Sequence, residues 1–202
     1  MKTFSQVTLS LTLLLTCFNF VYAEVKPGMA APDFSLKDMT NIERKLSDFK
    51  GKFVVLEWFN KDCPFVKKHY GAQNMQALQK KYTDKGVVWL SMYSSSKGKQ
   101  GYQEPEEALK TVKELKASST HQLADASGKV GQMYGAKTTP HIYIINPDQK
   151  VIYAGAIDDN SSSDPAVIPQ SKNYVSATLD LAMNGKSVEV QNTKPYGCGV
   201  KY

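Results

Sequence analysis

The stretch Val54–Val66, VVLEWFNKDCPFV, joins an apolar run to a single cysteine, a proline and the start of a helical pattern. A nearly continuous apolar run is typical of a strand covered on both faces of its sheet. Proline is favoured at the first position of a helix, so the sequence places Cys63 at a helix N-terminus. Unpaired N–H groups and the helix dipole favour a thiolate there, and the pKa of a thiol, ordinarily ~8.5, can fall to about 3.5–7.5. The stretch therefore predicts a reactive thiol at Cys63.

The first 23 residues predict a secretory signal peptide. Lys2 gives a positive start, an uncharged and mostly apolar stretch follows at 7–17, and Val21-Tyr22-Ala23 offers a cleavage site before Glu24. The apolar region is short for a membrane span. A lipoprotein anchored through Cys17 is an alternative, although Thr16 fits that motif poorly. We expect an exported protein, periplasmic or extracellular, with no stable membrane association after processing.

Processing at this point leaves 179 residues, enough for one domain with its own core. The formal charge of +6 for the whole chain falls to +5 when Lys2 is removed. Lysine supplies nearly all of the positive charge, and helix-face pairs such as Lys67-Lys68 are expected to be solvated. No interleaved aromatic and arginine pattern indicates nucleic-acid binding. We predict a single domain at 24–202 that includes a C-terminal tail at 186–202.

The order of expected elements is strand–helix–strand–helix–strand–strand–helix after an N-terminal hairpin. The hairpin uses an extended arm at 28–36 and a return strand at 42–46. Gly86, Gly135 and Gly185 close three of the helices. The expected strands are 53–59, 87–93, 141–145 and 151–155, and the expected helices are 64–84, 105–116, 128–134 and 171–183. This order predicts a three-layer α/β sandwich.

Several motifs together resemble the redoxin branch of the thioredoxin-like superfamily, also called alkyl hydroperoxide reductase/thiol-specific antioxidant. They are APDFSL (31–36), LSDFKGK (46–52), the strand–Cys–Pro–helix element, the Thr-Pro before a hairpin, and VIYAGAIDD (151–159). The resemblance covers roughly 25–185, and the ending PYGCGVKY is similar to that of a secreted subgroup. It implies a central mixed sheet of four to five strands with an N-terminal hairpin extension. It also implies that Cys63 is the attacking cysteine.

The chain departs from two patterns of the superfamily. A dithiol Cys-x-x-Cys motif would need cysteine at Val66. A peroxide-reacting cysteine usually has threonine or serine three residues earlier, where this chain has Asn60, and an arginine beside it, whereas the only arginine is Arg44 in the N-terminal arm. Asn60 could still hydrogen-bond a peroxide, and a lysine could supply charge, but neither reproduces an arginine fork.

Glu57 interrupts the apolar strand six residues before Cys63. Many thioredoxins carry a buried acid at this position that assists proton transfer. Burial would raise the pKa of the carboxyl towards the range of a general base. The alternative is that Glu57 lies at the end of the sheet and reaches solvent.

The resemblance makes Thr139-Pro140 a cis-proline loop that faces Cys63 and offers backbone groups to an extended substrate. Pro64 and Asn60 beside the cysteine, and His141 after the loop, are the other expected substrate-binding residues. His69 lies six positions after Cys63 and, on a regular helix, is expected to point away to the surface.

Cys198 is the second cysteine of the processed chain. It could resolve an oxidised Cys63 by thiol–disulfide exchange, or form a permanent staple that pins the tail. Gly197 and Gly199 would give the tail freedom to approach or leave. Spacing does not decide between these roles, since a disulfide needs Cα atoms within about 7 Å.

The leading interpretation is an exported thiol oxidoreductase that acts on disulfides or peroxides through Cys63, with a thiol or disulfide protein as partner. Two others remain open: a thioredoxin-fold binding module with a structural disulfide, and a copper-binding protein that uses Cys63, Cys198, His141 and His69. The chain lacks a CxxxC pair. We assign no cofactor and no resident metal.

Overall fold

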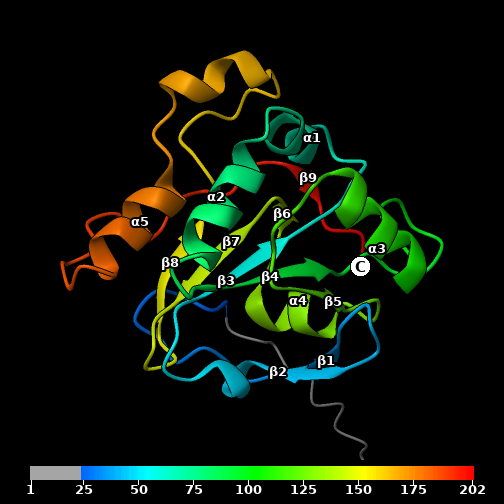
Figure 1. The fold of residues 1–202 in the computed structure, drawn as a ribbon, viewed down its shortest axis with the longest axis horizontal. Helices are drawn as coiled ribbons and strands as arrows, with labels where there is room; N and C mark the ends of the chain where they lie inside the picture. The colour runs from blue at the N-terminus through cyan, green and yellow to red at the C-terminus, as the bar shows by residue number, and fades with distance from the viewer. Residues whose placement is uncertain (1–23) are drawn as a thin grey trace, which may run out of the picture.

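The computed structural model describes residues 24–202, so the predicted signal peptide and Cys17 lie outside the described residues. The chain is built around a five-stranded mixed sheet in the order β5-β4-β3-β7-β8 (Figure 1). Strands β3, β4 and β5 are parallel, and β7 and β8 run antiparallel to them. Their bounds are β3 Val54–Trp58, β4 Val88–Tyr93, β5 His121–Ala124, β7 Ile142–Ile145 and β8 Val151–Gly155. The predicted mixed sheet of four to five strands is confirmed.

Helices cover both faces of the sheet. They are α1 Pro64–Gly71, α2 Asn74–Thr83, α3 Pro105–Glu114, α4 Lys129–Tyr134 and α5 Tyr174–Ala182. Alternate residues of β3 enter different cores because successive side chains of a strand point to opposite faces. Val55 packs in the core under α1, α2, α3 and α5, whereas Val54, Leu56 and Trp58 pack in the core with α4. The predicted three-layer sandwich is therefore confirmed.

The N-terminal hairpin is also confirmed. Strands β1 (Ser35–Lys37) and β2 (Glu43–Lys45) pair antiparallel, and a short 3-10 helix, η1 (Leu46–Phe49), leads from them towards β3. Arg44 donates to Asp38 at 2.8 Å within this hairpin. The carboxylate therefore holds the arginine in the N-terminal part of the fold.

The predicted helix at 64–84 is wrong as a single element. It divides into α1 and α2 at 72–73, where Gln73 has a left-handed φ of 57°. The physical reason is the spacing between the buried side chains Tyr70 and Met75. Five residues do not return to the same face of a helix, and the break brings both side chains to the core.

Two further differences concern segments of mixed polarity. Strand β5 was not predicted, because His121 and Gln122 interrupt its apolar pattern and are half-buried at the edge of the sheet. The segment between β8 and α5, for which the sequence predicts no helix or strand, contains a 3-10 helix, η2 (Pro165–Gln170). Within residues 24–202, no helix has the length and apolar character needed to cross a membrane.

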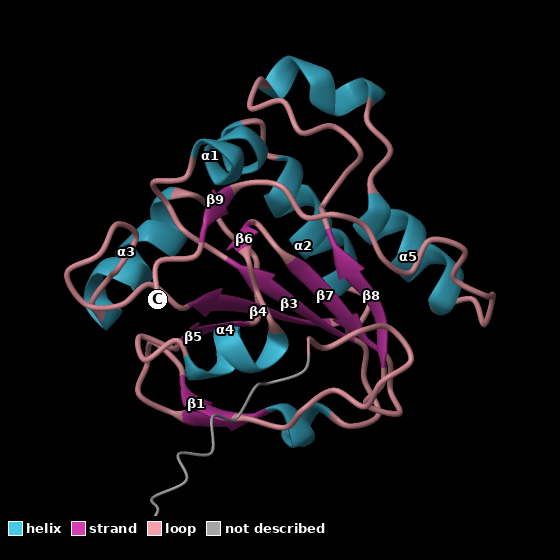
Figure 2. Cartoon of the chain, turned by 180° about the vertical axis from the view of Figure 1, so that it is seen from behind, coloured by secondary structure: helices cyan, strands magenta, loops and turns pink. Residues whose placement is uncertain are grey.

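The C-terminal tail returns to the centre of the molecule. Its short strand β9 (Cys198–Gly199) pairs antiparallel with β6 (Thr138–Thr139), which precedes β7. Figure 2 shows β9 beside β6 and α1, at the end of the sheet where α1 begins. The pairing thus brings β6 and β9, which are far apart in the sequence, together at the start of α1, the helix that follows Cys63.

Candidate active site

Cys63 is the N-cap residue of α1, with an extended backbone and Pro64 at the first helical position. The Lys67 N–H donates to the Cys63 carbonyl at 2.9 Å and closes the first turn. The cysteine as a whole is 0% exposed. The strand–Cys–Pro–helix pattern therefore places a buried thiol at a helix N-terminus, as the sequence predicts.

The Thr139–Pro140 peptide bond is cis, and the thiol of Cys63 donates to the Thr139 carbonyl at 2.9 Å. This confirms the expected geometry, in which the proline loop faces the cysteine. Thr139 is buried, and its hydroxyl donates to the Cys198 carbonyl at 3.4 Å. The loop consequently contacts both cysteines.

Cys198 reaches Cys63 across 135 positions of sequence. Its backbone N–H donates to Cys63 Sγ at 3.4 Å, and both thiols are free. Cys63 is fully buried, whereas Cys198 is partly exposed. The structure therefore brings the two cysteines together, which spacing alone could not show.

The two thiols share one environment but have opposite pKa shifts. Burial acts to raise the pKa of Cys63, but hydrogen bonds from the Cys198 thiol and from the N–H groups of Val66 and Cys198 outweigh it and lower the pKa below its ordinary value. Burial, and then the neighbouring Cys63, raise the pKa of the Cys198 thiol. Of the two thiols, Cys63 is therefore the one that loses its proton more readily.

Nearby lysines do not provide this stabilisation. Lys61 lies between the carboxylates of Asp62 and Glu107, at 3.4 and 3.6 Å. Lys68 pairs with Asp158 at 3.5 Å, and its side chain is 0% exposed. The expectation that Lys68 is solvated is therefore wrong, because segments far along the chain cover it.

Gly197 and Gly199, which flank Cys198, have different surroundings. Gly197 has a φ of 144°, and a Cβ atom there would lie 2.1 Å from the Thr139 carbonyl oxygen. Gly199 has only the Lys137 carbonyl oxygen near its Cβ position, at 3.9 Å. Glycine is therefore needed at 197 for close packing of the docked tail against the proline loop, and its role in the mobility of the tail stays a prediction.

The side chain of Asn60 is committed to its own surroundings. Its Oδ1 accepts from the Asp62 N–H at 2.9 Å, and its Nδ2 donates to the Gln100 carbonyl at 3.4 Å. Gly101 lies directly against its amide, where any Cβ would overlap. These contacts shape the turn before Cys63, and a role for Asn60 in binding peroxide stays a prediction.

Glu57 is buried, so the alternative of a solvent-exposed sheet end is wrong. Its carboxylate accepts hydrogen bonds from Tyr70 at 2.8 Å, Gln79 at 3.0 Å and Trp89 at 2.7 Å. Burial raises the pKa of Glu57 despite these donors. Among the hydrogen bonds of residues 24–202, none joins Glu57 to either cysteine, and its role in proton transfer stays a prediction.

Replacing Glu57 with glutamine is expected to remove a pH dependence of stability. Because the folded-state pKa is raised, the contribution of Glu57 is fully present below its unfolded pKa and is lost as pH rises through the folded value. The stability of the wild type relative to Glu57→Gln should therefore be greater at about pH 5 than at about pH 8. Urea unfolding at both pH values measures this, with the exposed Glu106→Gln as control; parallel pH curves would contradict it.

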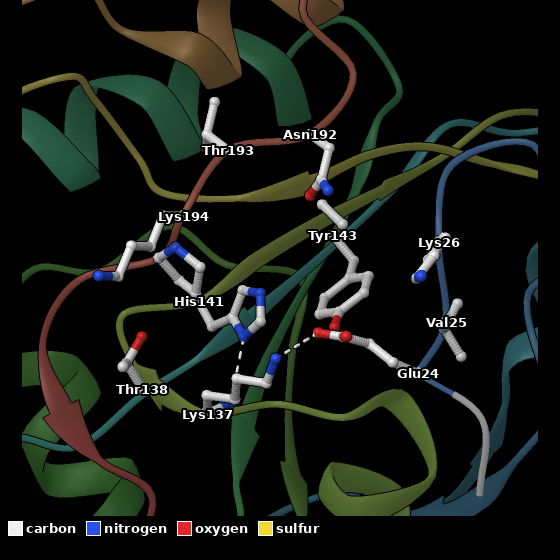
Figure 3. Close-up of a pocket in the computed structure, with 12 residues that line it drawn as sticks. Glu24, Val25, Lys26, Lys137, Thr138, His141, Tyr143, Asn192, Thr193 and Lys194 are labelled. Carbon is white, nitrogen blue, oxygen red and sulfur yellow. Dashed lines mark hydrogen bonds and ion pairs between the residues drawn. The ribbon is translucent and has the colours of Figure 1, made fainter.

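His141 lies at a cavity beside the proline loop and not at the thiols. The cavity measures 560 Å³, and Figure 3 shows His141 with Lys137, Thr138 and Lys194 around it. The Lys137 N–H donates to His141 Nδ1 at 3.2 Å, and burial lowers the pKa of the imidazole to about 3. The residues that line this cavity are Glu24, Val25, Lys26, Lys137, Thr138, His141, Tyr143, Ala154, Asn192, Thr193, Lys194 and Pro195. None is a cysteine, so the cavity is distinct from the thiol pair.

The expectation that His69 points to the surface is wrong. Its side chain is 0% exposed, and its Nε2 lies 3.0 Å from the hydroxyl of Tyr196 in the tail. A helix buried on one side by the core can be covered on its other side by a distant segment. The sequence signal was Tyr196 within the PYGCGVKY ending, but nothing local connected it to α1.

No group of three or more His, Cys, Asp or Glu side chains suited to a metal ion occurs among residues 24–202. The four residues suggested as copper ligands do not form one site. His69 bonds Tyr196, and His141 bonds the Lys137 backbone.

The fold, the cysteine at a helix N-terminus and the facing cis-proline define a protein of the thioredoxin-like class. Residues 27–154, more than half of the chain, match the AhpC/TSA family, and the chain belongs to this family. This confirms the resemblance to redoxins.

Three similar proteins illustrate the relationship. Thiol-disulfide oxidoreductase ResA of Bacillus thuringiensis subsp. konkukian (strain 97-27) is 28% identical over 125 residues, which cover 62% of this chain and 66% of ResA, just under two thirds of its length. An uncharacterized conserved protein of Geobacillus kaustophilus is 28% identical, with a TM-score of 0.72 over 87% of this chain and 92% of its own. A Chlorobium tepidum protein named as thiol:disulfide interchange protein DsbE is 26% identical, with a TM-score of 0.53 over 65% and 85% of the two chains.

Proposed function

We propose that the protein is an exported thiol–disulfide oxidoreductase in which Cys63 and Cys198 alternate between two thiols and one disulfide. The observation that carries the proposal is the hydrogen bond from the Cys198 N–H to Cys63 Sγ, which places the two cysteines beside each other. The relationship to proteins named as thiol-disulfide oxidoreductases supports the same class of chemistry.

In the proposed reaction, the Cys63 thiolate attacks one sulfur of a partner disulfide. A mixed disulfide forms on Cys63, and the other partner sulfur leaves as a thiolate. Cys198 then loses its proton and attacks Cys63 Sγ, which forms the Cys63–Cys198 bond and releases the second partner thiol. In the reverse direction, the Cys63–Cys198 disulfide is reduced to two thiols and the two partner thiols are oxidised to a disulfide. Because Cys63 is fully buried under the tail, a protein partner requires the tail to move.

Hydrogen bonds lower the pKa of Cys63, and the one from the Val66 N–H belongs to α1 and remains when the tail moves. This supports Cys63 as the attacking group, since the thiolate is the nucleophile. The cis-proline loop, through Thr139 and Pro140, would hold the partner chain near this sulfur once the tail has moved. A peroxide substrate has less support, because Asp38 holds Arg44 within the N-terminal hairpin and Asn60 is engaged by Asp62 and Gln100.

Oxidation of the reduced protein tests this function. One equivalent of a small disulfide, such as oxidised glutathione, is expected to convert both free thiols into one intramolecular bond, and dithiothreitol should reverse it. Intact mass records the loss of two hydrogen atoms, and peptide mapping identifies Cys63 and Cys198. A product that carries only glutathione adducts would overturn the proposal.

Export is the second part of the proposal and rests on the sequence of residues 1–23. Expression of the full chain in a bacterium is expected to yield a periplasmic or secreted protein that begins at Glu24. The intact mass of the exported protein decides the point. A product that retains Cys17 with an added lipid would instead make it a membrane-anchored lipoprotein.

A further inference from the structure

The hydroxyl of Tyr196 lies at the centre of a buried polar cluster that links the tail to α1. We define this Tyr196 cluster as Tyr196 with Lys68, His69 and Asp158. His69 Nε2 lies 3.0 Å from the hydroxyl, Lys68 Nζ lies 3.4 Å from it, and the hydroxyl donates to Asp158 Oδ1. The side chains of Lys68 and His69 are 0% exposed and that of Asp158 is 2% exposed.

The hydrogen bonds of the cluster have one consistent direction. The Asn74 amide donates to His69 Nδ1 at 2.8 Å, so the imidazole proton is on Nε2 and faces the tyrosine. Burial lowers the pKa of His69 to about 4, which keeps this ring neutral near pH 7. His69 therefore donates to Tyr196, and Tyr196 donates to Asp158. Lys68 completes the cluster by donating to the Asn160 carbonyl at 2.8 Å while it faces Asp158 at 3.5 Å.

Buried charges of this kind contribute little net stability, because desolvation offsets their attraction. Their geometric effect is more specific. The tail enters the cluster at Tyr196, two residues before Cys198. Helix α1 carries Cys63 at its start and Lys68 and His69 about one and a half turns later. One rigid helix therefore holds both the attacking sulfur and the partners of the tyrosine.

We propose that Tyr196 is a positioning residue for the Cys63–Cys198 exchange, and that its hydroxyl holds Cys198 against Cys63 by fixing the tail to α1. The proposal rests on the proposed function and extends it to a residue that touches neither sulfur. Tyr202 fixes the other side of Cys198, since its hydroxyl donates to the Ala136 carbonyl at 2.7 Å and its ring packs on Gly128 and Gly131. The tail is thus held on both sides of the cysteine.

Tyr196→Phe tests the proposal because it removes the hydroxyl and keeps the ring. The ring packs edge-on against that of Phe65, with 5.7 Å between the ring centroids. In a Cys198→Ser background, the tail should open more often, and iodoacetamide should alkylate Cys63 roughly tenfold faster, the effect of losing one hydrogen bond to a charged group. With both cysteines present, the intramolecular step should slow by about the same factor. That step is followed as the second release of thionitrobenzoate after reaction with dithionitrobenzoate.

A general loss of stability would also expose Cys63 and separate the two cysteines, so the experiment needs a control that loses a comparable hydrogen bond elsewhere. Tyr82→Phe is the matched control, because Tyr82 is also buried and also donates to a carboxylate, that of Asp180, at 3.0 Å. Tyr82 lies on α2, away from the tail. It should lower the stability of the fold and leave both rates unchanged. If Tyr196→Phe changes neither rate, or if Tyr82→Phe changes both equally, the proposal is wrong.

Failure of the proposed function would look different. A wild-type protein that shows no second release of thionitrobenzoate lacks the exchange between Cys63 and Cys198. The alkylation rates would still report whether Tyr196 holds the tail over Cys63, and an unchanged rate would overturn that part independently.

Discussion

Cys63→Ser is expected to abolish thiol–disulfide exchange by the protein and leave only the uncatalysed rate measured in buffer alone. A serine hydroxyl cannot form a disulfide, and Cys198 has a raised pKa, so it supplies little thiolate at neutral pH. Cys198→Ser should behave differently. Its Cys63 retains hydrogen bonds from the Val66 N–H and the residue 198 N–H, so the first attack should proceed and then stop at a mixed disulfide.

Reduction of a model protein disulfide measures turnover, and non-reducing electrophoresis detects the trapped adduct. The adduct should accumulate on Cys198→Ser and be absent from Cys63→Ser. A permanent staple predicts another pattern, in which either variant loses similar stability, about 2–4 kcal/mol, and neither forms an adduct. Full activity in Cys63→Ser would remove both the mechanism and the site.

The sequence predicted the parts of this site that depend on local pattern. The apolar run before Cys63, the proline after it and the Thr-Pro before a hairpin are short-range signals, and each corresponds to a structural element. Helix periodicity likewise predicted α3, α4 and α5 to within a few residues. These features follow from backbone chemistry within one or two turns of chain.

The failures share a different cause. The burial of Lys68 and His69 depends on Tyr196, more than a hundred positions away. No local pattern reports which distant segment will cover a polar face. The same limit applied to Cys198, whose two possible roles both required contact with Cys63 but whose place in the fold is set by pairing between β9 and β6.

Gly197→Ala is expected to displace the tail from the proline loop. The new Cβ would lie 2.1 Å from the Thr139 carbonyl oxygen, which also accepts the hydrogen bond from Cys63. A φ of 144° adds strain of roughly 1–3 kcal/mol for a residue with a side chain. That cost corresponds to a drop of about five- to 150-fold in the equilibrium constant for docking of the tail.

The displaced tail would uncover Cys63 and withdraw Cys198 at the same time. Gly197→Ala should therefore be alkylated at Cys63 faster than the wild type and should form the intramolecular disulfide more slowly. Gly199→Ala is the matched control, because its Cβ would meet nothing closer than 3.9 Å and its backbone is not in the left-handed region. Both rates should stay near wild type in that variant. Equal behaviour of the two alanine variants would show that close packing at Gly197 does not hold the tail.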